Sequence, residues 1–112
     1  MQNVHNIFNL NKEKFFTEDE AYELVNLFLA VTAKAKNKIN ALNSRLEYYK
    51  HQPEVADEIQ FELNSEIQKW SEKVKRLGGI PLSLYNVHIP HSEGYYLWSF
   101  PSAELEFTEE TH

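Results

Sequence analysis

An apolar stripe runs along residues 17–52, a stretch that contains no glycine and no proline. Thr17 followed by Glu20 forms a capping box, in which the hydroxyl and the carboxylate satisfy free backbone N–H groups at a helix start. The stripe has spacings of four and three, as in a coiled coil, which place it on one helix face: Leu24, Phe28, Val31, Ala35, Ile39, Leu42, Leu46 and Tyr49. The pattern predicts one helix over residues 17–52, about 50 Å long at about 1.5 Å per residue.

Pro53 is the stop signal for this helix, because proline disfavours helical geometry at the preceding residue and suits the first turn of a new helix. A second helix is predicted over residues 53–77, with Gly78 and Gly79 as its C-terminal stop. Its stripe contains Ala56, Ile59, Leu63, Ile67, Trp70, Val74 and Leu77. Two stripes joined by a short connector predict a long antiparallel two-helix hairpin.

The charges favour the same arrangement, because a basic stretch before Pro53 is followed by an acidic stretch after it. With the turn centred near residue 52, Arg45 faces Glu58 and Lys38 faces Glu66. Each exposed ion pair contributes only about 0.2–1 kcal/mol. These pairs therefore select the antiparallel register rather than hold the hairpin together.

After Gly79 the pattern changes to that of a short aromatic β-hairpin over residues 80–101. One strand is predicted from Leu82 to Ile89, a turn over residues 91–94, and a returning strand over residues 95–100. Alternation then gives one face with three aromatic residues, which we expect to pack on the start of helix one: Tyr96, Trp98 and Phe100.

The remaining residues are an N-terminal segment, 1–16, and an acidic tail, 102–112, which we expect to fray beyond Phe107. The predicted fold class is mainly α (α+β), in a single domain over residues 1–112: a long antiparallel two-helix hairpin followed by a short aromatic β-hairpin packed on the start of helix one.

Composition narrows the classes of function. The formal net charge of −6 argues against a nucleic-acid-binding protein, and no apolar run reaches the roughly 18 residues that cross a bilayer. The chain contains no cysteine, which excludes thiolate chemistry and disulfides. The N-terminus lacks the pattern of a signal peptide. We therefore expect a cytoplasmic protein that binds neither nucleic acid nor membrane.

No catalytic, metal-binding or cofactor motif stands out, and no cofactor is expected. His88 and His91 are three residues apart, and Glu93 and Glu104 are the carboxylates that could join them in a metal site. Positions i and i+3 of a strand, however, point to opposite faces. The residue types that remain as candidates for a small-molecule site lie in or beside the β-hairpin: His88, His91, Tyr96, Trp98 and Glu104.

Several short motifs occur in a fixed order along the chain. They are Phe-Thr-x-x-Glu-Ala at residues 16–21, a strand that ends in proline at residues 87–90, and Gly-x-Tyr-x-Trp at residues 94–98. This order resembles that of the small bacterial and archaeal family called domain of unknown function 2203, over roughly residues 15–109. The resemblance implies a bacterial or archaeal protein with the helical-hairpin fold, and no function, because the family has none assigned.

The chain is a divergent member in this comparison. Where the family carries Asp, Cys and a final Trp-His, this chain has His88, Leu97 and the pair at residues 108–109. Trp98, Pro101 and Glu104 match the family pattern. Any polar site that the family builds from those positions is therefore lost or rebuilt here.

Two functional hypotheses follow. The first is a non-enzymatic protein-interaction or oligomerisation module that forms a homodimer through its helical faces, since apolar residues also lie off the stripes: Val25, Leu29, Ala33, Tyr48, Val55 and Phe61. The alternative is a small-molecule or metal-binding protein with a site between the β-hairpin and helix one. The sequence favours the non-enzymatic role.

Overall fold

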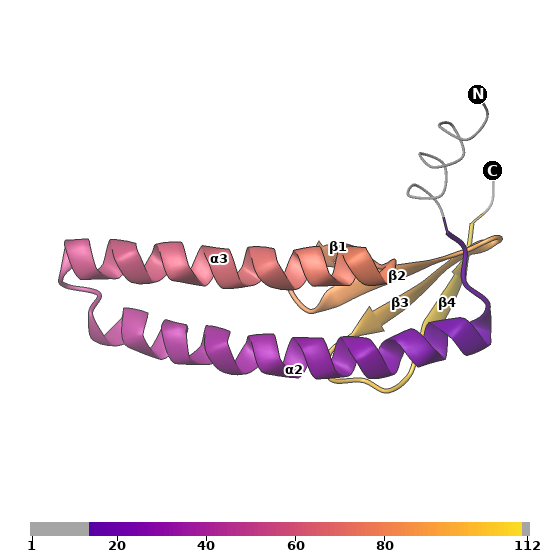
Figure 1. The fold of residues 1–112 in the computed structure, drawn as a ribbon, viewed down its shortest axis with the longest axis horizontal. Helices are drawn as coiled ribbons and strands as arrows, with labels where there is room; N and C mark the ends of the chain where they lie inside the picture. Colours follow the sequence, from indigo (N-terminus) through magenta and orange to yellow (C-terminus); the bar gives the residue numbers. More distant parts are fainter. Residues whose placement is uncertain (1–13, 111–112) are drawn as a thin grey trace, which may run out of the picture.

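Two helices and four strands follow one another along residues 14–110, the part of the chain that the structure, a computed structural model, describes. Figure 1 shows the two helices side by side as a hairpin, with the strands beside the end where α2 begins and α3 ends. The elements are α2 (Glu18–Tyr48), α3 (Pro53–Leu77), β1 (Ile80–Ser83), β2 (Asn86–His91), β3 (Gly94–Ser99) and β4 (Glu106–Glu109). This is an α+β fold.

The capping box at the start of α2 is confirmed. Thr17 Oγ1 accepts the backbone N–H of Glu20 at 3.2 Å, and Glu20 Oε1 accepts that of Thr17 at 3.0 Å. This backbone hydrogen bond to Thr17 holds the pKa of the Glu20 carboxyl below its ordinary value. The side chain of Glu20 therefore fixes where the helix begins.

The boundaries of the helices differ from the prediction at one point. Helix α2 ends at Tyr48 rather than near residue 52, because residues 49–51 form the turn and Gln52, before Pro53, is extended. Helix α3 spans the predicted residues 53–77 and ends at Gly78, whose φ of 105° is left-handed and suits glycine.

The ion pairs between the helices support the antiparallel register. Lys38 Nζ lies 4.0 Å from Glu66 Oε1, as predicted. Arg45 pairs with Glu62, at 3.8 Å, and the predicted pairing with Glu58 is wrong. Glu58 and Glu62 are one helical turn apart on the same side of α3, so a shift of one turn along the helix brings Glu62 to the long arginine side chain.

One buried hydrogen bond joins the two helices. Trp70 Nε1–H of α3 donates to Thr32 Oγ1 of α2 at 2.8 Å. Thr32 is completely buried and Trp70 is 2% exposed. A buried N–H group is costly without an acceptor, so this bond holds the two helices in register where the hairpin meets the sheet.

The sheet has four antiparallel strands in chain order, β1-β2-β3-β4, where the sequence predicts only two. The predicted strand from Leu82 to Ile89 is wrong, because Leu84 and Tyr85 form a turn and Tyr85 has a left-handed φ of 73°. The predicted fraying beyond Phe107 is also wrong for residues 108 and 109, because residues 106–109 pair with β3 as strand β4.

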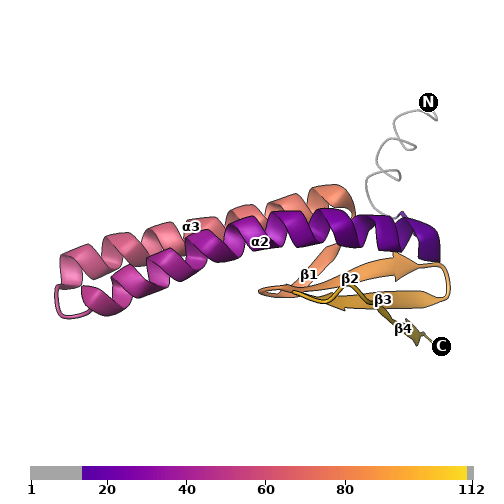
Figure 2. The ribbon, with the colours of Figure 1, turned by 90° about the horizontal axis from the view of Figure 1, so that it is seen from below.

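The sheet lies on one side of the helical layer, as Figure 2 shows. Along β3, Tyr96 and Trp98 are buried while the residues between them are partly exposed. The ring of Trp98 lies 5.5 Å from that of Phe28 in the first half of α2. The aromatic face of β3 therefore packs on α2, and the other side of the helical layer, called here the outer side, carries no sheet.

The N-terminal end of the described chain is tied to the sheet. The backbone N–H of Phe16 donates to the backbone oxygen of Pro90 at 2.8 Å, and the Phe16 side chain is buried. Residues 1–13 of the expected N-terminal segment, and residues 111–112, lie outside the described residues. Between residues 14 and 110 no helix combines the length and apolarity needed to cross a bilayer.

Candidate functional site

The structure places His88 and His91 on opposite faces of the sheet, as their spacing on one strand requires. The ring of His88 stacks on that of Tyr95 at 3.8 Å, on the face turned away from the helices. The ring of His91 instead contacts the edges of Tyr96 and Phe107 on the helical side. The two histidines therefore do not share a ligand.

The other three candidates also have structural partners. Tyr96 is 6% exposed and Trp98 is fully buried, with Trp98 Nε1–H donating to the backbone oxygen of Ser102 at 2.7 Å. Glu104 accepts a hydrogen bond from the Tyr22 hydroxyl at 3.3 Å. Burial raises the pKa of the Tyr96 phenol above its ordinary value.

An open hollow does lie where the alternative hypothesis expects a site, between the sheet and the start of α2. Its lining residues are Glu18, His91, Glu93, Tyr96 and Phe107. His91 Nδ1, however, already accepts the backbone N–H of Glu93 at 3.0 Å. Within residues 14–110 no group of three or more His, Asp or Glu side chains is arranged to hold a metal ion.

His88 nevertheless makes a testable contribution to stability. Burial lowers the pKa of its imidazole, against a smaller opposite effect of Glu110. The unfolded chain then binds the proton more readily, so stability is greatest above the ordinary pKa of about 6.5 and declines as the pH falls through it. We expect a His88→Phe variant to lose less thermal stability than the wild type between neutral and mildly acidic pH. Parallel melting curves would contradict this.

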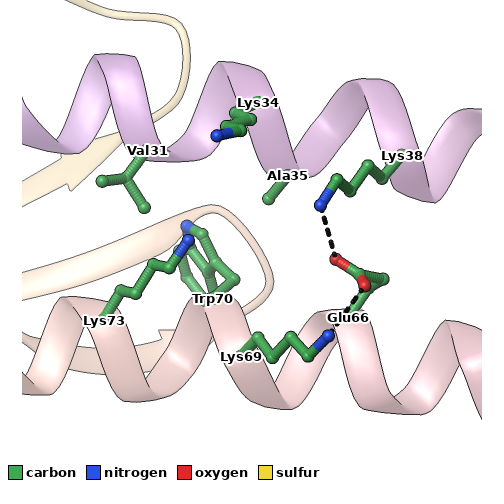
Figure 3. A pocket seen from close by; sticks show the side chains of 8 residues that line it. All are labelled: Val31, Lys34, Ala35, Lys38, Glu66, Lys69, Trp70 and Lys73. Atoms are coloured by element: carbon green, nitrogen blue, oxygen red, sulfur yellow. Dashed lines mark hydrogen bonds and ion pairs between the residues drawn. The ribbon is translucent and has the colours of Figure 1, made fainter.

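Charged side chains from both helices line a groove on their outer side, which we call the lysine groove. Its lining residues are Val31, Lys34, Ala35 and Lys38 from α2, and Glu66, Lys69, Trp70 and Lys73 from α3. Figure 3 shows the four lysine side chains entering from both helices. Four ammonium groups and one carboxylate leave three net positive charges, in a chain whose net charge is −6.

Helical spacing explains why these lysines meet. Lys34 and Lys38 are four residues apart, as are Lys69 and Lys73, so each pair lies along one side of its helix. Lys36 points about 200° away from both neighbours. Its ammonium group lies 5.5 Å from the centre of the Tyr85 ring, on the sheet side. The lysine groove therefore opens on the outer side, away from the sheet.

The carboxylate of Glu66 neutralises only part of the groove. It pairs with Lys38 at 4.0 Å and with Lys69 at 3.4 Å, as the dashed lines in Figure 3 mark. Lys34 and Lys73 are the other two cations around the groove. Trp70 contributes an apolar floor, fixed from beneath by its hydrogen bond to Thr32. A second anion therefore has an electrostatically favourable place beside Glu66.

The lysine groove is absent from the sequence-based candidates. The register predicted for the two helices could have located this groove. A pairing of Lys38 with Glu66 brings Lys34 opposite the helical turn that runs from Lys69 to Lys73. Comparison with known proteins adds no assignment: the chain matches no protein-family model, no curated protein and no solved structure. The resemblance to domain of unknown function 2203 stays a prediction.

Proposed function

We propose that this chain is a non-enzymatic interaction module and that the lysine groove is its working surface. The observation that carries the proposal is the meeting of four lysines from two helices around a single carboxylate. Like charges four residues apart on a helix destabilise it by about 0.2–0.5 kcal/mol for each pair. Anionic groups of a partner would relieve this repulsion in both helices at once.

The size of the groove indicates what enters it. Its cavity volume is about 40 Å³, whereas pockets for small-molecule ligands usually measure about 300–1,000 Å³. A space of this size suits a single carboxylate or a group of similar size. Acidic side chains on the surface of another protein present such groups, which supports a docking role over the binding of a whole metabolite.

Binding of a fluorescein-labelled hexaglutamate peptide, measured by fluorescence anisotropy, tests the proposal. We expect the wild type to bind it in a salt-dependent manner. A Lys34→Gln/Lys73→Gln variant should bind it about tenfold more weakly, which corresponds to about 1.4 kcal/mol for two exposed charges. Both substitutions keep a long polar side chain and remove only the charge.

The matched control is Lys50→Gln/Lys75→Gln, which removes the same number of charges outside the groove. Lys50 lies at the turn, where it pairs with Glu47, and Lys75 points about 200° away from Lys73. We expect this control to bind nearly as tightly as the wild type. Equal weakening in the two variants would mean that the peptide senses only total charge, which would overturn the proposal.

A further inference from the structure

The outer side of α3 is divided into an acidic half and a basic half. Glu58, Glu62 and Glu66 follow one another at spacings of four, and Lys69 and Lys73 continue the same side towards the C-terminal end. Glu66, at the boundary, is already neutralised by lysines of its own chain. The acidic half thus presents Glu58, together with Glu62, which also lies 3.8 Å from Arg45 of its own chain in an exposed ion pair. The basic half presents the α3 wall of the lysine groove.

We infer that the partner of the lysine groove is a second copy of this chain, with the two α3 helices packed antiparallel along their outer sides. This inference rests on the proposed function, because it names the occupant of the same groove. In an antiparallel pair, Lys73 of one copy faces Glu58 of the other, and Lys69 faces Glu62. Both pairs have residue numbers that sum to 131, so one register satisfies both.

Two-fold symmetry doubles these contacts. A symmetric interface repeats every contact, so each copy presents both its acidic and its basic half and four ion pairs form between the copies. The centre of this register falls between Ser65 and Glu66. Ser65 lies three residues after Glu62 and four before Lys69, on the same side of α3. A small side chain at the two-fold axis lets the helices approach closely.

Phe61 adds an apolar contact to the same interface. Its side chain is 76% exposed, and it lies beside an open hollow whose wall includes Val55, Glu58 and Glu62. In the register given above it faces the turn between Lys69 and Lys73 of the second copy. An aromatic ring there covers the aliphatic stems of the lysines and attracts their ammonium groups.

Over residues 14–110, the arrangement of layers leaves room for this pairing. The sheet covers the opposite side of the helical layer (Figure 2), so a second hairpin can approach the outer side without displacing a strand. Two hairpins packed in this way form a four-helix assembly, which is a common way for helical hairpins to bury apolar surface. The outer sides of the two hairpins then face each other, and the two sheets lie on the far sides of the dimer.

Sedimentation of charge-reversed variants tests the inference. We expect the wild type to sediment at about twice 13.2 kDa at high micromolar concentration. Two variants, Lys69→Glu/Lys73→Glu and Glu58→Lys/Glu62→Lys, each place like charges against each other in the symmetric pair. Each should sediment as a monomer, with a dissociation constant raised by roughly a hundredfold or more.

The decisive sample is an equimolar mixture of the two variants, because every reversed residue then faces a residue of opposite charge. We expect the mixture to regain the mass of a dimer, and circular dichroism to show that each variant alone is folded. A mixture that stays monomeric while the wild type dimerises would overturn the inference. A wild type that is monomeric throughout, yet binds hexaglutamate in its groove, would overturn the self-pairing and leave the proposed function standing.

Discussion

Replacing Trp98 with alanine is expected to lower the free energy of unfolding by about 3–5 kcal/mol, as truncation of a large buried aromatic side chain usually does. Trp98 is fully buried and its ring lies 5.5 Å from that of Phe28. The alanine leaves a cavity between the sheet and α2. Small domains are stabilised by only about 5–15 kcal/mol in total, so this one substitution removes a large fraction. Urea denaturation followed by circular dichroism measures the loss.

Leu97→Ala provides the control for this measurement, because Leu97 is the preceding residue of the same strand and faces away from the helices. Its side chain is partly exposed, so we expect a loss of about 1 kcal/mol or less. Both variants place an alanine in the same strand. If the two substitutions cost the same, the packing of β3 on α2 does not supply the stability assigned to it.

Replacing Thr32 with valine is expected to cost about 1–3 kcal/mol, although the two side chains have nearly the same shape. The valine removes the acceptor of the Trp70 Nε1–H hydrogen bond, whose length is 2.8 Å. Both residues are almost completely buried, so water cannot replace the lost oxygen without opening the hairpin. Chemical denaturation again gives the free energy of unfolding.

Thr32→Ser separates the hydrogen bond from the packing, because serine keeps the hydroxyl and loses only a methyl group. We expect a cost of about 1 kcal/mol or less for this variant. A double-mutant cycle with Trp70→Phe completes the test, since the valine should cost much less once the indole N–H is gone. A valine variant as stable as the wild type would show that the buried bond contributes nothing.

The helical part of the fold could be predicted because its signals are local. The capping box at Thr17 and Glu20 is present in the structure, and α3 begins at Pro53 and ends at Leu77, directly before Gly78, as the residue types indicate. The end of α2 differs by four residues, because a chain that must reverse direction before a proline needs a few residues for the turn. The apolar stripe along the helix does not show how many residues the connecting turn needs.

The strands were harder to predict, because their deciding features are not local. The turn between β1 and β2 places Tyr85 in a left-handed conformation, which is uncommon for a bulky residue. The left-handed position is therefore not marked by glycine or asparagine, and Asn86 follows it as the first residue of β2. Strand β4 is acidic and exposed along its whole length. It is held by pairing with β3, such as Tyr96 with Phe107, and not by an apolar pattern of its own.

The candidate site illustrates the same limit. Read along one helix, Lys36 points about 200° away from Lys34 and Lys38, so the run of three lysines suggests no common surface. Only the register with α3 brings Lys34 and Lys38 beside Lys69 and Lys73. The histidines, which attract attention in the sequence, are separated by the pleat of a single strand. Predicting the groove required placing the two helices side by side in the correct register. The predicted ion pair between Lys38 and Glu66 already defines that register.

The two edge strands of the sheet affect how this chain behaves at high protein concentration. The outermost strands, β1 and β4, are four residues long. Strand β1 contains Pro81, which has no N–H to offer, and β4 carries Glu106 and Glu109. Short edge strands that contain proline or repeated negative charge are poor templates for the pairing of a further strand. The sheet is thereby protected against the edge-to-edge addition of strands that produces fibrils.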